Sequence, residues 1–282
     1  ILMKKHAKAF DAAAPDLKAS VCGWPAPSFD VPLVDFERIE NGAFEKWVNE
    51  NYLRINRFCD VEPMSSLSVS DNVKLPYIRA AKDRQILLET SYEEIKKSFV
   101  DTRKLAYTAM VGSGDISTEL LKMTYKNFYS VFDKIAVFLQ AYLNLPIKVH
   151  QADFASIWTD RKGYLREDVM SNPQNLSLLA LYNVKLDVYG SNSLYYVIDE
   201  QTKDLKLIRN FIEHKVIVIR DGEMHYDDYQ LQISREELAF NTVRLAQLVR
   251  CAIIYLCNFV LHSENDKIFS RKRSINDINK LK

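Results

Sequence analysis

The sequence predicts an all-α protein, an up-and-down helical bundle, and three observations support this fold class. Two long segments, 117–143 and 234–262, place apolar residues on one helical face at spacings of three and four. Glycine is scarce, with 7 residues in 282, which disfavours β-sandwiches and glycine-rich nucleotide loops. Hydrophobic residues make up 48% of the chain, enough to fill a sizeable core.

The first long helix of the bundle is predicted over residues 91–110. Ser91 has the side chain of an N-cap, and Glu94 stands three residues later in the capping-box position. The glycine-containing stretch 112–114 ends this helix. The second helix, 117–143, is broadly apolar and therefore central.

The later elements follow from similar signals. Residues 202–215 predict the third helix, and the β-branched run 216–219 predicts a short extended piece after it. Ser234 is the expected N-cap of the last helix, with Glu237 three residues later. Beyond residue 263 the tail is charged, so we expect it to be mobile or bound to a partner.

Two regions fall outside this bundle pattern. Residues 1–77 are predicted to be an N-terminal helix and an extended arm that packs on a helical domain at 78–282, because the arm is rich in proline but too apolar for a free linker. A helix is expected within residues 36–51 of this arm. Residues 149–194 read as an insertion between the second and third helices, with a short helix within 175–189.

Charge, cysteines and hydropathy narrow the functional classes. The net charge of +1 gives no global basic field, so contact with RNA would be local. The four cysteines form no CxxC pair, and the five histidines show no metalloenzyme spacing, so neither a metal nor a cofactor is expected. No stretch of 18 uncharged apolar residues is present, and we expect a cytoplasmic protein with no membrane partner.

A polar constellation interrupts the predicted third helix. Arg209, Asn210 and His214 lie within six residues, next to an apolar helical face. Spacings of four place Asn210 beside His214 and Arg209 beside Glu213. Arginine grips phosphate oxygens in a fork and histidine moves a proton near neutral pH, so these residue types suit phosphodiester chemistry.

The bare spacing of arginine and histidine is weakly specific. A second occurrence, Arg220 to His225, spans the turn signal at Asp221 and Gly222 and cannot form the same helical arrangement. A solvated helix face therefore remains an alternative reading of residues 209–214. A basic patch in the insertion, with Arg161, Lys162 and Arg166, could contact a nucleic-acid backbone or could be a solvated loop.

The six residues Arg209 to His214, with asparagine directly after the arginine, resemble the motif of the HEPN superfamily. The stretches 98–107 and 51–56 also look like the first helix, and its lead-in, of a HEPN branch often found behind helical repeats. The resemblance implies a helical bundle that forms a homodimer, with two motif helices facing a shared cleft. It also implies a metal-independent endoribonuclease of toxin or phage-defence type.

The resemblance assigns a role to each motif residue. His214 would be the general base or acid at the ribose 2′-OH or the leaving oxygen, Arg209 would stabilise charge on the phosphate, and Asn210 would orient His214 or bind phosphate. Glu213 would orient Arg209. Val216 stands where some HEPN toxins carry a tyrosine that a partner enzyme modifies, so such neutralisation is not expected.

Two other functions remain open from sequence. Some HEPN proteins have no nuclease activity, so the chain could be a non-catalytic dimerisation or binding module for an upstream repeat domain or an antitoxin. A metal-dependent enzyme is disfavoured because no paired ligand spacing occurs.

Overall fold

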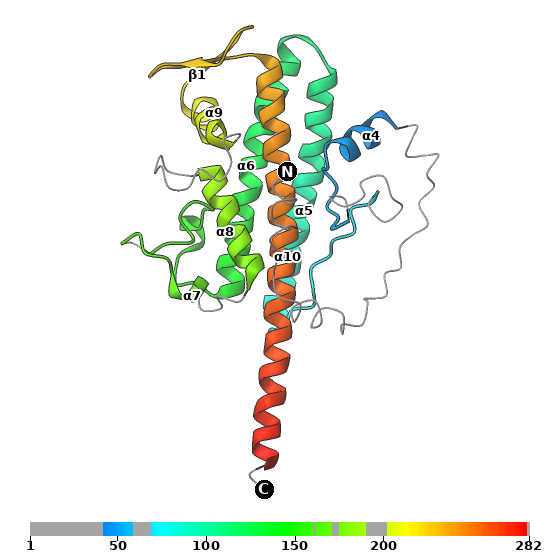
Figure 1. Cartoon of the computed structure of the whole chain (residues 1–282), viewed down its shortest axis with the longest axis vertical. Helices are drawn as coiled ribbons and strands as arrows, with labels where there is room; N and C mark the ends of the chain where they lie inside the picture. The colour runs from blue at the N-terminus through cyan, green and yellow to red at the C-terminus, as the bar shows by residue number, and fades with distance from the viewer. Residues whose placement is uncertain (1–41, 59–68, 161, 171–174, 190–201, 281–282) are drawn as a thin grey trace, which may run out of the picture.

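The computed structural model of the chain describes residues 42–58, 69–160, 162–170, 175–189 and 202–280. The helix and proline-rich passage expected before residue 42 lie outside them. Figure 1 shows three long helices at the centre: α5 (Lys82–Val111), α6 (Gly114–Leu143) and α10 (Arg235–Lys280). The predicted all-α helical bundle is therefore confirmed.

The first long helix begins earlier than the sequence indicated. α5 starts at Lys82, nine residues before the expected N-cap at Ser91. Ser91 lies inside the helix, where its hydroxyl donates to the carbonyl of Leu87 at 2.8 Å. Glu94 accepts from Ser98 and from Lys134 of α6, so it serves no capping box. The capping-box prediction was wrong because the same residue types also bond locally within a helix.

The last helix begins as predicted and continues further. The hydroxyl of Ser234 accepts from the backbone N–H of Glu237 at 3.0 Å, as an N-cap does. The helix then runs past residue 263 to Lys280, beyond the bundle (Figure 1). The first part of the expected mobile tail is packed: Glu264 is 2% exposed and accepts from the backbone of Arg79 at 3.0 Å.

The apolar content of α10 belongs to the core. The segment Arg235–Ile268 is long and apolar enough to cross a membrane by length and composition, and 67% of its apolar window is buried inside the bundle. Burial against α5, α6 and α8 accounts for this hydropathy, as in the core helix of a folded bundle.

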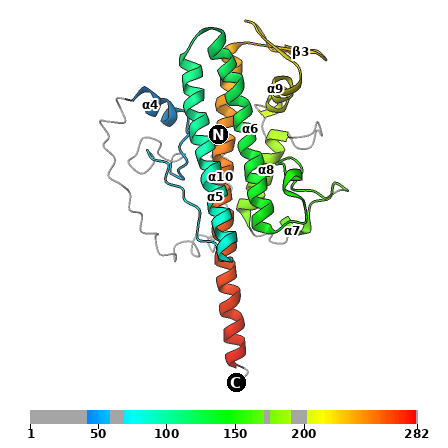
Figure 2. The ribbon, with the colours of Figure 1, turned by 180° about the vertical axis from the view of Figure 1, so that it is seen from behind.

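The predicted insertion supplies the helices on one side of the bundle. It contains the 3-10 turn η1 (Val149–Gln151), the short helix α7 (Glu167–Met170) and α8 (Leu176–Tyr189), which confirms the helix expected within 175–189. α9 (Lys203–His214) follows. Figures 1 and 2 show α8 and α9 on one side of α6, and α4 with the arm on the opposite side.

A small sheet follows α9. Its strands are β1 (Val216–Ile219), β2 (His225–Tyr226) and β3 (Gln230–Ile233), in the order β1-β3-β2. β1 pairs with β3 in parallel and β2 pairs with β3 antiparallel. The short extended piece predicted at 216–219 is thus confirmed, and the second arginine–histidine spacing spans a strand connection instead of a helix.

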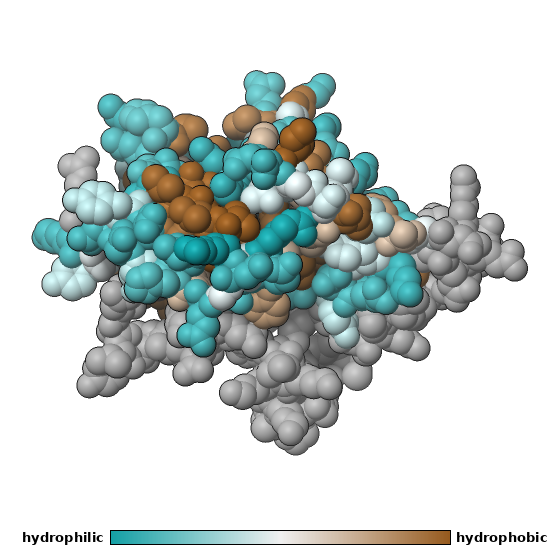
Figure 3. Space-filling view, turned by 90° about the horizontal axis from the view of Figure 1, so that it is seen from above, coloured by the Kyte–Doolittle hydropathy of each residue, from teal (hydrophilic) through white to brown (hydrophobic). Residues whose placement is uncertain are grey.

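Exposed apolar side chains gather at the end of the molecule that carries the sheet and the α5–α6 turn. Figure 3 views this end and shows a hydrophobic patch bordered by hydrophilic residues. Large exposed apolar residues on these elements and on the first turns of α10 include Val111, Ile116, Val216 and Phe240. We call these four residues the end patch; no element among the described residues covers them.

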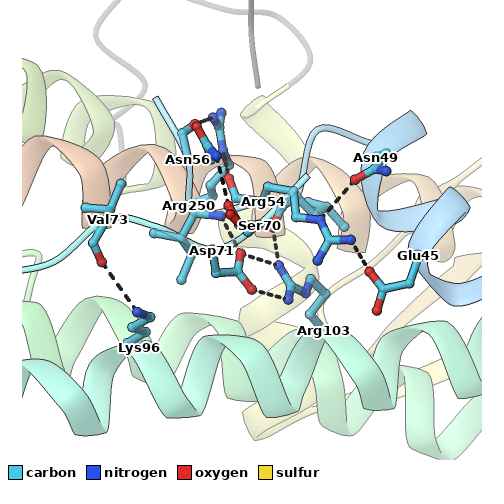
Figure 4. A network of polar contacts seen from close by, with 12 residues as sticks. Glu45, Asn49, Arg54, Asn56, Ser70, Asp71, Val73, Lys96, Arg103 and Arg250 are labelled. Atoms are coloured by element: carbon cyan, nitrogen blue, oxygen red, sulfur yellow. Dashed lines mark hydrogen bonds and ion pairs between the residues drawn. The ribbon is translucent and has the colours of Figure 1, made fainter. Parts of the chain in front are cut away.

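The arm is fixed to the bundle by buried arginines (Figure 4). α4 (Ala43–Glu50) forms the only helix of the described arm and falls within the helix expected over 36–51. Arg103 of α5 donates to the carbonyl of Leu53 at 2.6 Å and to both carboxylate oxygens of Asp71. Arg250 of α10 donates to the carbonyls of Arg54 and Asn56. Backbone carbonyls of the arm and the carboxylate of Asp71 therefore satisfy charges that the bundle buries.

Candidate active site on helix α9

The sequence places the arginine–histidine motif at the C-terminal end of α9. Leu205, Ile208 and Phe211 are buried and hold this amphipathic helix against the bundle. The helix ends at His214 because Lys215 adopts an extended conformation (φ −141°, ψ −164°) that leads into β1. Consequently the motif lies where the helix meets the sheet.

Arg209 is clamped between two tyrosines. Its guanidinium carbon lies 5.0 Å from the ring centroid of Tyr129 in α6 and 5.6 Å from that of Tyr189 in α8. A guanidinium over an aromatic face is attracted by the ring quadrupole. The side chain is 26% exposed, and its Nε is buried without a hydrogen-bond partner in the described part of the chain. The clamp therefore fixes the stem of Arg209.

Glu213 joins the arginine and the histidine. Its Oε2 lies 3.3 Å from Nε of Arg209 and 3.7 Å from Nε2 of His214. The Glu213 side chain is 18% exposed, whereas that of His214 is 70% exposed. The guanidinium and the imidazole thus approach one carboxylate oxygen, and the imidazole remains open to solvent.

Acidic neighbours keep the guanidinium charged. Asp133 follows Tyr129 by one turn of α6 and therefore shares its face. Burial alone would lower the pKa of Arg209, but Tyr189, Glu213 and Asp133 raise the pKa further than burial lowers it. Burial raises the pKa of Asp133, and its bond from the Phe154 N–H and the charge of Arg209 only partly offset this.

Asn210 lies on the exposed side of α9, one turn before His214. Within the described residues the side chains of Asn210 and His214 form no hydrogen bond with each other, so the expectation that Asn210 orients His214 stays a prediction. Its exposed amide is free to meet a substrate.

The basic patch of the insertion is not brought to this site by any contact between described residues. Arg161 lies outside the described residues, and Lys162 is exposed. Nε of Arg166 donates to the carbonyl of Ile157 at 3.1 Å, which ties it to its own loop. Their predicted role in substrate binding remains a prediction.

Sequence reasoning missed Tyr129, Tyr189 and Asp133. The sequence reasoning did not single out Tyr129 in its helix, and Tyr189 was predicted only as the end of a short helix. One available signal was the pairing of Tyr129 with Asp133, since a hydroxyl and a carboxylate one turn apart on the buried face of a central helix call for a polar partner.

No group of three or more metal-ligating histidine, cysteine, aspartate or glutamate side chains occurs among the residues that the structure describes. The site combines a solvent-exposed imidazole, a guanidinium and a carboxylate between them. These groups can move a proton and stabilise negative charge.

Comparison with known proteins identifies the family of the chain. The model of the family described as LA2681-like HEPN matches residues 111–264, more than half of the 282-residue chain. This region covers α6, the insertion, α9, the sheet and the bundled part of α10. No curated protein and no solved structure matches the chain. The chain belongs to the LA2681-like HEPN family.

Proposed function

We propose that this protein is a metal-independent endoribonuclease of toxin or phage-defence type that acts as a homodimer. The observation that carries the proposal is the convergence of Arg209 Nε and His214 Nε2 on Oε2 of Glu213, at 3.3 and 3.7 Å. A phosphodiester placed beside Arg209 and His214, on the side away from this carboxylate, would meet a guanidinium and an imidazole together.

The residues suit cleavage by an internal nucleophile. His214 accepts the proton of a ribose 2′-OH, and the 2′-oxygen forms a bond to phosphorus. The bond from phosphorus to the 5′-oxygen breaks, and that oxygen takes up a proton. The products are a 2′,3′-cyclic phosphate and a 5′-OH. Arg209 stabilises the negative charge that develops on the phosphate oxygens.

The clamp gives Arg209 a defined direction for this task. A long side chain that is already ordered loses less conformational entropy when it binds phosphate. Tyr129 and Tyr189 supply this order, and the charge of Glu213 lies 3.3 Å from Nε, while the terminal nitrogens of the fork serve the substrate.

A homodimer would complete the site with a second acid–base pair. In a two-fold dimer the same surface of each copy meets its counterpart. The end patch lies on the sheet end of the molecule, where α9 terminates, and burying it would bring two motif helices toward each other (Figure 3). One His214 would then act as base and the other as acid.

The test is cleavage of structured RNA by purified protein in EDTA. We expect the wild type to cut and to leave a 2′,3′-cyclic phosphate, and His214→Ala to remove cutting while the melting temperature is kept. The chain offers a matched control, because His225→Ala removes another exposed histidine, that of the second arginine–histidine spacing. Cutting that persists in His214→Ala, or that disappears in His225→Ala, contradicts the assignment.

The alternative is a non-catalytic dimerisation or binding module that partners an upstream repeat domain or an antitoxin. It is favoured by one observation: Arg209 is three-quarters buried, and a clamped arginine also stabilises helix packing. In that case a dimer would form without RNA cleavage. Growth arrest on expression that His214→Ala relieves and His225→Ala does not would exclude this alternative, because His214 is exposed and takes no part in helix packing.

A further inference from the structure

The junction of α8 and α9 brings two lysines together beside the motif. Lys185 lies one turn before Tyr189 in α8, and Lys206 lies one turn before Arg209 in α9. α8 and α9 pack against each other, and the Tyr189 ring lies 5.6 Å from the Arg209 guanidinium. This packing places the turn of α8 that carries Lys185 near the turn of α9 that carries Lys206.

Lys185 is influenced by burial and by the charge of Lys206. The ammonium of Lys185 lies 5.6 Å from the ring centroid of Tyr182, on a half-buried side chain. Burial and then the positive charge of Lys206 lower the pKa of Lys185. Neither lysine forms an ion pair with a carboxylate in the described part of the chain. By contrast, Lys134 pairs with Glu94 at 2.6 Å.

This arrangement is electrostatically unfavourable in the absence of an anion. Two like charges repel each other, and the repulsion grows where low-dielectric protein replaces water. An anion held between them removes the repulsion and gains attraction from both. The site therefore favours a group with negative charge and several acceptor oxygens, as a phosphate has.

An exposed stripe connects the lysine pair to the motif. Lys206, Asn210 and His214 follow one another at intervals of four residues, and all three are exposed. They line one side of α9, and with a rise of about 1.5 Å per residue the stripe is roughly 12 Å long. A polymer laid along it would meet a cation, an amide and the imidazole in turn.

We propose that Lys185 and Lys206 form a phosphate subsite for single-stranded RNA, which holds a backbone phosphate next to the linkage presented to Arg209 and His214. The proposal rests on the proposed nuclease function and names the strand path of that site. Asn210 lies between the two positions and contacts the intervening nucleotide.

The test uses a single-stranded 2′-O-methyl RNA oligonucleotide, which cannot be cut by 2′-OH attack, and measures its affinity for the protein at several salt concentrations. Each lost phosphate contact on a single strand reduces the slope of log K against log salt by about 0.7. Lys185→Gln/Lys206→Gln should therefore reduce the slope by roughly 1.4, and Lys206→Gln alone by roughly 0.7. The single variant decides the test if the double variant does not fold.

The matched control is Lys82→Gln/Lys104→Gln. Both of these lysines are exposed on α5, across the bundle from α8 and α9 (Figure 1). The control should leave the slope unchanged. An equal fall in slope for both double variants, or no fall for either, overturns the subsite.

Cleavage assays separate this proposal from the nuclease assignment. In an active enzyme, loss of the subsite should raise KM more than it lowers kcat, since the lysines bind the strand away from the reacting bond. If RNA is cut in a His214-dependent way and the slope is unaffected, the subsite is wrong and the nuclease stands. If the slope falls but RNA is never cut, the subsite stands and the nuclease is wrong.

Discussion

The guanidinium of Arg209 lies 5.0 Å above the ring of Tyr129, which belongs to the central helix α6. This contact links the motif helix to the core of the bundle. An arginine in such a stack cannot be replaced by lysine without loss, because the ammonium lacks both the planar face and the fork. The position of Arg209 therefore depends on a residue 80 positions earlier in the chain.

Removal of the Tyr129 ring should reduce RNA cleavage without removing any motif residue. We expect Tyr129→Leu to lower kcat/KM about tenfold, which corresponds to losing roughly 1.4 kcal/mol of cation–π positioning. Tyr129→Phe keeps the ring and should stay close to wild type. The test compares the initial rates of RNA cleavage of these variants at a temperature well below their melting temperatures. Phe128→Leu removes a neighbouring buried ring that packs on Phe99, and it should not change the rate beyond its effect on stability.

Asp133 should destabilise the fold at neutral pH. Burial raises the pKa of Asp133, so the folded state favours the protonated carboxyl and stability falls as the pH rises above the ordinary aspartate range. Asp133→Asn keeps an oxygen for the Phe154 N–H and removes the charge, so its melting temperature at pH 7 should be higher than that of the wild type. Thermal unfolding of both proteins at pH 4 and pH 7 checks this. A melting temperature of Asp133→Asn below that of the wild type at pH 7 would contradict it.

The ion pair of Asp71 and Arg103 should be a major stabilising contact. The two side chains are 17% and 2% exposed, and removing one partner of a buried pair costs about 3–5 kcal/mol. Asp71→Asn should lower the free energy of unfolding by this order. Asp101→Asn, in the exposed pair with Lys97, should cost less than about 1 kcal/mol.

The same contact should also make the free energy of unfolding depend on pH in the acidic range. Burial raises the pKa of Asp71, but the hydrogen bonds and charge of Arg103, with smaller contributions from Ile55 and Arg54, hold it below its ordinary value of 3.8. A carboxyl whose pKa is lowered by folding contributes stability that is present above its unfolded pKa and lost as the pH falls through the folded value. Urea unfolding between about pH 5 and pH 2 should show this loss in the wild type, and a flatter profile in Asp71→Asn.

The two serines expected to cap helices should respond differently to substitution. Ser234→Ala should cost about 1 kcal/mol, because its hydroxyl satisfies the Glu237 N–H at the start of α10. Ser91→Ala should be neutral or slightly stabilising, because Ser91 lies inside α5 and alanine is the better helix former there. Equal losses from the two variants would contradict the assignment of the helix starts.

Much of the fold could be predicted from periodicity and local chemistry. The end of α9 was predictable because a β-branched run follows the helix, and the start of α10 because Ser234 stands directly before an apolar pattern. The start of α5 was not predictable in this way. Residues 82–90 lack a strong apolar face, and what holds this end is tertiary: Leu88 is buried in the core and Arg84 donates to the carbonyl of Ala141.

In the candidate site, too, the features set by local sequence could be predicted and those set by tertiary contacts could not. Arg209, Asn210, Glu213 and His214 could be found because they lie within six residues of one helix. The clamp could not, because Tyr129 and Tyr189 reach Arg209 from two other helices and a pattern within one segment carries no information on such contacts. The lysine pair is hidden for the same reason, since 20 residues separate Lys185 from Lys206.

The two arginines buried under the arm limit how many N-terminal residues can be removed without loss of the fold. Arg103 and Arg250 are 2% and 1% exposed, and the carbonyls and carboxylate that they bond come from residues 53–71. A polypeptide limited to the family-matched residues 111–264 would lose the arm and α5, and would leave the guanidinium of Arg250 without these acceptors. Trimming to the homologous region should therefore yield aggregates, whereas a polypeptide that keeps α5 and residues 53–71 retains the acceptors of both arginines.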